Sequence, residues 1–205
     1  MQSSMTTNVE LAAQNAVREL LARRNSEGVW VGNLSSSALS TATAILALSA
    51  SGEVEAATAD AELIARGRAW LAQTQNDDGG WGDTTLSLSN ISTTALCWAA
   101  LPDGDTASRA EAWLAKAAGA ADPDSLSRAI ARRYGKDRTF SVPILTALAI
   151  GNRLGPRQQA WARITQFPFE LAAAPHSWFQ WLRLPVVSYA LPALIAIGLA
   201  KSSES

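Results

Sequence analysis

The chain has 205 residues, 48% of them hydrophobic, with 17 Lys and Arg against 18 Asp and Glu and a formal net charge of −1. This composition provides a sizeable core, and the absence of a basic excess argues against nucleic acid as a partner. The single cysteine, Cys97, excludes an intramolecular disulfide and favours a reducing, cytoplasmic location.

Apolar residues recur with helical spacing along the chain, whereas alternating β-branched runs are short or absent. We expect no signal peptide in the first fifteen residues, because they contain neither a basic start nor an apolar run. The predicted helices, in chain order, are 8–24, 40–51, 53–74, 92–101, 107–118, 125–133, 140–152, 157–164 and 186–201. The prediction is an all-α protein with one domain over residues 1–205, and flexible ends at 1–8 and 201–205.

The longest apolar run is at 185–200. Its sixteen residues would form a helix of about 24 Å, which is shorter than the ~30 Å hydrocarbon core of a bilayer. We therefore expect a buried helix here and not a membrane span.

An internal repeat is visible in the first half. Gly28 and Gly79 are 51 residues apart, as are Trp30 and Trp81. Gly32 breaks the match, and a weaker third copy has Trp113 in the place of Trp70. In each clear copy an amphipathic helix leads through a Gly-x-Trp turn into a nearly all-apolar helix. Such a repeat predicts stacked helical hairpins in two layers, a partial α/α barrel or toroid.

The stretch QTQNDDGGWGD, residues 73–83, contains three aspartates that could offer oxygen ligands to Mg²⁺ or Ca²⁺. The alternative is a structural turn in which the glycines let Trp81 fold back and the Gln75 amide reaches neighbouring helix ends. The equivalent turn in the first copy, NSEGVWVG, has only Glu27 as an acid. The shared Gly-x-Trp favours the structural interpretation, and we expect no metal.

Residues of the second copy resemble the QW repeat of squalene-hopene cyclases and related triterpene cyclases. The matching residues are Arg66, Gly67, Trp70, Leu71, Gln75, Gly79 and Trp81. The first copy is similar to a degenerate repeat without the Gln. Later stretches, beginning KDRTFSVPILTALAIG, resemble the sequence that follows in that family, so the resemblance covers most of residues 15–199.

The resemblance implies an α/α barrel that cyclises squalene or another linear polyprenoid by protonating a terminal alkene, without metal or other cofactor. Aromatic faces stabilise the carbocations, and the proton comes from a D-x-D-D motif. This sequence has no D-x-D-D, and its nearest string is DPDS at 122–125. We expect the N-terminal half of such an enzyme, not catalytic alone and peripheral on the inner membrane, with an acid-bearing domain or subunit as partner. The alternative is a stand-alone module that binds an apolar ligand or a protein.

An aromatic cluster near the C-terminus is the most ligand-like feature. Its members are Trp178, Phe179, Trp181 and Tyr189. These residues either pack the end of the barrel or line an apolar pocket for a polyprenoid. The only histidine, His176, has no acid near it in sequence and is interpreted as a surface residue. The basic segment 128–138 is interpreted as a solvated helix end that could also meet lipid headgroups or a partner domain.

Overall fold

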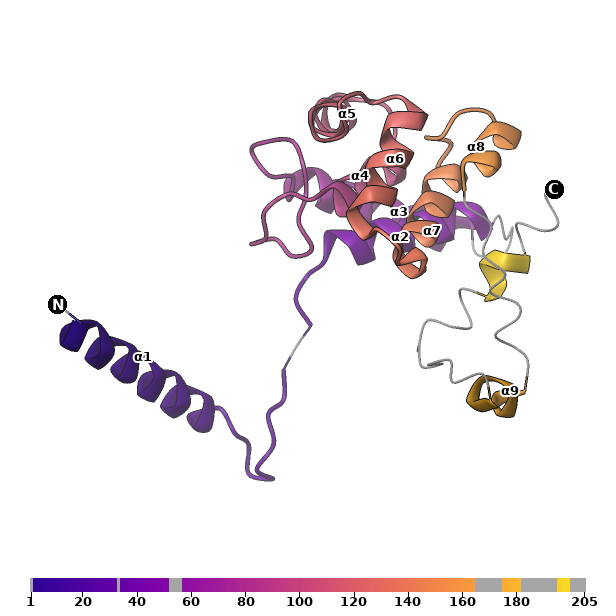
Figure 1. The fold of residues 1–205 in the computed structure, drawn as a ribbon. Helices are drawn as coiled ribbons and strands as arrows, with labels where there is room; N and C mark the ends of the chain where they lie inside the picture. Colours follow the sequence, from indigo (N-terminus) through magenta and orange to yellow (C-terminus); the bar gives the residue numbers. More distant parts are fainter. Residues whose placement is uncertain (1, 33, 52–56, 165–174, 182–194, 200–205) are drawn as a thin grey trace. The chain divides into compact units, whose positions relative to one another are not determined.

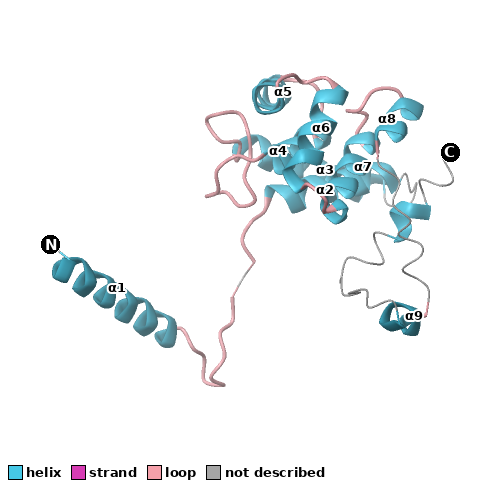
Figure 2. Cartoon of the chain, viewed as in Figure 1, coloured by secondary structure: helices cyan, strands magenta, loops and turns pink. Residues whose placement is uncertain are grey.

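The computed structural model describes residues 2–32, 34–51, 57–164, 175–181 and 195–199 (Figure 1). Within these ranges all regular structure is helical and no strand occurs (Figure 2). The prediction of an all-α protein is therefore confirmed. The chain divides into two compact units, residues 1–35 and residues 36–205.

The first unit consists of α1 (Gln2–Ala22) and the turn that follows it. Helix α1 begins six residues before the predicted start and includes most of the segment 1–8 that we expected to be flexible. The segment 2–8 contains neither proline nor glycine, so nothing in its sequence ends the helix.

The second unit contains the other helices. Their bounds are α2 (Ala38–Ser51), α3 (Ala57–Gln73), α4 (Ile91–Ala100), α5 (Asp105–Ala118), α6 (Pro123–Tyr134), α7 (Arg138–Ile150), α8 (Arg157–Arg163) and α9 (His176–Trp181). Helices α2, α4 and α7 contact one another, while α3 packs on α2, α5 on α4, and α6 on α5 and α7. Every residue of α4 from Ser92 to Ala100 is buried, as its nearly all-apolar sequence predicts.

Helix α2 differs from its prediction. Its small apolar sequence suggested packing on most sides, but only one side is buried, through Ala38, Ala42, Ile45 and Leu46. Thr43, Ala44 and Ala47 are exposed. The reason is positional: α2 is the first helix of its unit, so among the described residues of that unit no earlier hairpin lies against its other side.

Capping residues mark the start of α4 and the end of α5. Asn90 precedes α4 and accepts from the backbone N–H groups of Ser92 and Thr93 at 3.1 and 3.0 Å. Gly119 ends α5 in the left-handed conformation, with φ of 92°. Such caps satisfy backbone groups that a helix leaves unpaired at its ends.

The predicted C-terminal helix 186–201 lies mostly outside the described residues, and its segment 195–199 is helical. Helix α9 was not predicted, because HSWFQW is too short to show helical periodicity. None of the described helices combines the length and the apolar character that crossing a membrane requires.

Candidate functional site

The side chain of Gln75 joins two parts of the second unit. Its Nε2 donates to the carbonyl oxygen of Gly79 at 2.8 Å and to that of Thr106 at 3.0 Å. The first bond closes the turn after α3, and the second reaches the first turn of α5. We call residues 75–81 the Gly-Trp turn. One amide therefore links this turn to the next helix along the chain.

Helix α5 contacts the Gly-Trp turn through a single face. Arg109 donates to the carbonyl oxygens of Asn76 and Asp77, both at 3.2 Å. Trp113 donates its indole N–H to Asp78 Oδ2 at 3.0 Å. Thr106, Arg109 and Trp113 follow one another at intervals of three and four, so they lie on one face of the helix. The role of Arg109 was not predicted from the sequence, because the spacing shows that these residues share a helix face but not which segment that face contacts.

Trp81 anchors the other end of the turn in the core. Its side chain is 1% exposed, and its Nε1 donates to the Leu71 carbonyl oxygen at 3.0 Å. Its backbone N–H donates to Thr94 Oγ1 of α4 at 3.0 Å. The indole thus satisfies its polar group while its ring contributes to the core, and the turn is tied to both α3 and α4.

Two glycines of the turn are required by close approach. Gly79 has φ of +90°, and a Cβ there would lie 2.8 Å from the carbonyl oxygen of Arg109. A Cβ on Gly80 would lie 2.6 Å from Ser89 Cβ. Because side chains at these positions would overlap neighbouring atoms, the turn packs closely only with glycine.

Two of the three aspartates in this stretch accept hydrogen bonds. Asp78 accepts from Gly80 N and Ser89 Oγ at 3.0 and 2.7 Å, in addition to Trp113. Partial burial raises the pKa of Asp78, but these hydrogen bonds together hold that pKa below its usual value. Asp83 accepts from Thr93 Oγ1 and Asn90 Nδ2 at 2.6 and 2.9 Å, and both bonds lower its pKa.

The metal interpretation is the weaker one for this geometry. Oxygens of Asp78 and Asp83 are already used by protein donors, while Asp77 is exposed. Over the described residues, no three His, Cys, Asp or Glu side chains gather in a group that could hold an ion. The stretch at 73–83 organises helix ends.

The first copy of the repeat has the same local geometry in the first unit. Gly28 has φ of 78°, and Trp30 Nε1 donates to the Leu20 carbonyl oxygen at 2.6 Å. Asn25 N donates to the Val29 carbonyl oxygen at 2.9 Å, as Asn76 N does to that of Gly80 at 3.0 Å in the second copy. The repeat at an offset of 51 residues is therefore a repeat of hydrogen bonds as well as of amino-acid sequence.

The remaining residues of the predicted QW repeat lie on α3. Arg66 pairs with Glu62 one turn earlier at 3.8 Å, with both side chains mostly exposed. A Cβ on Gly67 would lie 3.0 Å from Ile45 Cδ1, so this glycine lets α2 approach closely. Trp70 is partly buried against the core, and Leu71 is fully buried.

A comparison with protein families identifies one matching family. The model of the squalene-hopene cyclase N-terminal domain matches residues 13–145, which include both copies of the repeat and α2 through the first half of α7. The chain belongs to the squalene-hopene cyclase N-terminal domain family. Searches of curated proteins and of solved structures gave no significant match.

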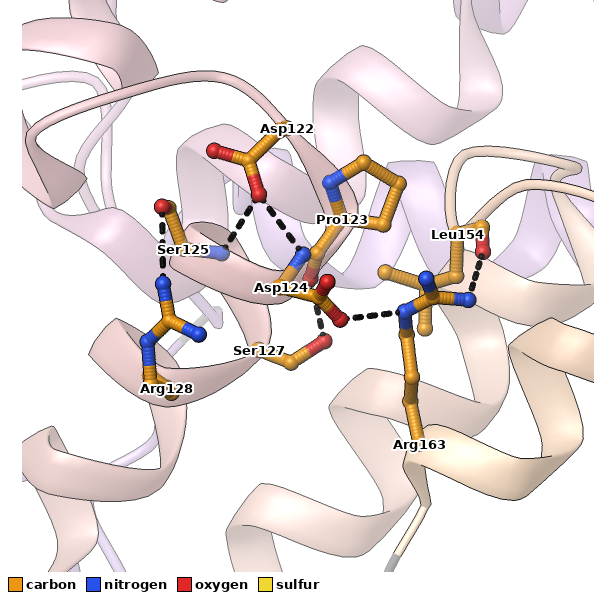
Figure 3. A network of polar contacts seen from close by, with 8 residues as sticks. All are labelled: Asp122, Pro123, Asp124, Ser125, Ser127, Arg128, Leu154 and Arg163. Carbon is orange, nitrogen blue, oxygen red and sulfur yellow. Dashed lines mark hydrogen bonds and ion pairs between the residues drawn. The ribbon is translucent and has the colours of Figure 1, made fainter.

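The DPDS segment was the nearest approach to the acid motif of squalene-hopene cyclases, and it forms a helix start (Figure 3). Asp122 caps α6, accepting from Asp124 N and Ser125 N at 3.0 and 2.9 Å. The Ser125 side chain and then its backbone N–H lower the pKa of Asp122. Asp124 pairs with Arg163 at 2.7 Å. Asp122 is therefore held ionised, the opposite of what an acid that protonates an alkene requires.

The predicted pocket-lining aromatic residues are only partly within the described structure. Trp178 and Trp181 of α9 are 62% and 82% exposed. The Phe179 side chain and Tyr189 lie outside the described part, as does the His176 side chain. A pocket formed by these residues stays a prediction. Cys97 is fully buried in the core, and burial raises the pKa of its thiol.

Proposed function

We propose that this chain supplies the N-terminal part of a linear-polyprenoid cyclase in triterpenoid biosynthesis and completes an apolar cavity whose proton donor lies on another domain or subunit. Support comes from the family match over residues 13–145 and from the Gly-Trp turn that ties α5 to α3 and α4. In this proposal α2, α4 and α7 form the inner layer of a partial α/α barrel, and α3, α5 and α6 form the outer layer.

The observation that assigns the proton donor to a partner is the ionised state of Asp122. Cyclisation begins when an acid protonates a terminal alkene, so the donor must be held protonated by its surroundings. The pKa of Asp122 is lowered by its capping hydrogen bonds, and Asp124 is engaged with Arg163. Neither carboxyl suits the task, and an acid-bearing partner supplies the proton.

Within this proposal, aromatic faces of this chain stabilise the positive charge that moves along the folded polyprenoid. Trp178 and Trp181 are the candidates for that contact. Because squalene is carried in lipid, the assembled protein works at a membrane surface, as a peripheral protein and without a cofactor from this chain.

A co-incubation assay tests the proposal. The purified chain is mixed with squalene in detergent, alone and together with a separately expressed domain that carries D-x-D-D, and products are identified by mass spectrometry. Cyclic product only in the mixture is the expected result. Cyclic product from this chain alone would overturn the assignment of the proton donor to a partner. The absence of product both from the chain alone and from the mixture would overturn the cyclase role.

The second candidate function is a stand-alone module that binds an apolar ligand without catalysis. The observation that favours it is the high exposure of two indole rings on one short helix. Saturable quenching of tryptophan fluorescence by squalene, lost in Trp181→Ala and kept in Trp30→Ala, would support this module if the co-incubation assay gives no product.

A further inference from the structure

The junction of α6 and α7 concentrates positive charge in a chain whose net charge is −1. The eleven residues 128–138 contain five cations, Arg128, Arg132, Arg133, Lys136 and Arg138, and one acid, Asp137. The segment therefore carries a net charge of +4. This charge has no role in the cyclase proposal.

Three of these arginines line one hollow. Arg128, Arg132 and Arg138 line a shallow depression of about 380 Å³ together with Ala131 and Gly135. Arg128 and Arg132 are exposed and one turn apart, while the buried residues of α6, such as Leu126 and Ile130, face the core. Ala131 and Gly135 are small, which leaves room between the three arginines.

The nearby acids are already engaged. Asp122 accepts backbone N–H groups at the start of α6, and Asp124 pairs with Arg163 (Figure 3). Asp137 accepts from Thr139 N at 2.9 Å and from its hydroxyl.

The arginines themselves are poorly compensated. Arg128 donates to the neutral Ser125 Oγ at 3.1 Å and is only weakly attracted by Asp122. Among the described residues, neither Arg132 nor Arg138 forms an ion pair.

Helix electrostatics explain only part of this arrangement. Arg132 lies in the last turn of α6, where a cation interacts favourably with the helix dipole. Arg128 lies in the middle of α6, and Arg138 is the first residue of α7, the end at which a cation is unfavourable. An external anion in the hollow would offset this repulsion.

We infer that the hollow between Arg128, Arg132 and Arg138 binds a phosphate-type oxyanion, carried by a phospholipid headgroup or by a soluble phosphate or diphosphate. The planar guanidinium fork matches two oxygens of such a group, and several forks around one hollow give the charge-assisted bonds that hold it. Because the hollow is open, it suits an oxyanion presented at the end of a larger molecule.

The test uses the full chain labelled with ¹⁵N and follows the arginine Nε–H signals by NMR. One arm adds sodium diphosphate, and the other adds vesicles of phosphatidylcholine with and without phosphatidylglycerol. We expect a saturable shift of the Arg128, Arg132 and Arg138 signals. Saturation by diphosphate alone identifies a soluble ligand, and a response only to vesicles with phosphatidylglycerol identifies a headgroup.

Variants that each remove one positive charge test whether binding depends on this hollow or only on the net charge of the chain. Arg132→Gln should weaken binding about tenfold, the effect of losing one charge-assisted bond. Lys116→Gln removes the same charge from an exposed position on α5 and should change the affinity less than about twofold. Equal weakening by both variants, or no shift of the three arginines with either probe, would overturn the inference. Arg132→Lys distinguishes the guanidinium fork from charge alone, and circular dichroism checks that each variant is folded.

Discussion

Arg24 lies 51 residues before Gln75, and each side chain donates an N–H to the carbonyl oxygen of the glycine four residues later. The distances are 2.9 Å to Gly28 and 2.8 Å to Gly79. Arg24 also places its guanidinium 5.3 Å from the Trp30 ring centre. In both copies a long side chain with an N–H donor therefore closes the turn, and glutamine is one way to provide it.

Gln75→Ala should lower the free energy of unfolding by about 1–3 kcal/mol, because two carbonyl oxygens lose their donor in a partly buried site. Urea unfolding measures the change. Gln73→Ala is the matched control, since Gln73 is exposed two residues earlier, and it should change the stability by less than about 0.5 kcal/mol. Equal effects of the two substitutions would show that the Gln75 hydrogen bonds do not contribute.

Gly82→Ala should destabilise the fold by about 1–3 kcal/mol through steric overlap. A Cβ at Gly82 would lie 2.5 Å from the Ser87 carbonyl oxygen and 2.6 Å from that of Leu88, and both are backbone atoms. A Cβ at Gly32 would have no atom within 4 Å, so Gly32→Ala should be nearly neutral. Thermal melts of the two variants measure the difference in stability. Equal midpoints would contradict the prediction.

Asp83 should contribute to the loss of stability in acid. Hydrogen bonds from Thr93 and Asn90 place its folded pKa below the ordinary value of 3.8, so the unfolded chain takes up the proton more readily. Its stabilisation is complete above about pH 4 and is lost as the pH falls through the folded pKa.

Asp83→Asn should therefore lose less stability than the wild type on acidification from about pH 5 to pH 2. Urea midpoints measured over this range give the slope. Asp77→Asn is the control, because the Asp77 carboxylate makes no hydrogen bond in the described structure. Parallel curves for Asp83→Asn and wild type would contradict the assignment.

The Cys97 thiol should resist reagents in the folded protein. Its side chain is fully buried, and burial raises its pKa, so the reactive thiolate is scarce. A colorimetric disulfide reagent at mildly alkaline pH should react slowly with the native chain and rapidly in urea. Fast reaction in the native state would mean that α4 opens readily.

The sequence predicted most helices of the second unit to within four residues at either end, because their apolar spacing and turn residues agree. The start of helix α6 was nevertheless predicted two residues late. The predicted start was Ser125, whereas Asp122 caps the helix and Pro123 occupies its first position. An acid followed by proline is a helix-start signal, but DPDS was weighed only against the D-x-D-D motif, which it does not match.

The candidate site was predictable in its local part and in the reach of the Gln75 amide to a neighbouring helix end, but not in the residues that it meets there. The positive φ of Gly79 and the bond from the Trp81 indole to Leu71 of the preceding helix follow from turn chemistry. Thr106 and Arg109 were not identified, since nothing in their own sequence shows that their helix packs against the Gly-Trp turn. The exposure of α2 was missed for the same reason: burial depends on which neighbours are present.

Some hydrogen bonds of the Gly-Trp turn enclose a short stretch of chain, and others enclose a long one. The bonds from Gln75 to Gly79 and from Trp81 to Leu71 span 4 and 10 residues, whereas the bond from Gln75 to Thr106 spans 31. Short closures form early and long ones late, because ordering a longer loop takes more entropy. During synthesis the turn can close before α5 is complete, with its second donor unsatisfied until that helix arrives. Each helical hairpin would then pack against the hairpin before it, so that the hairpins fold one after another in the order of the sequence.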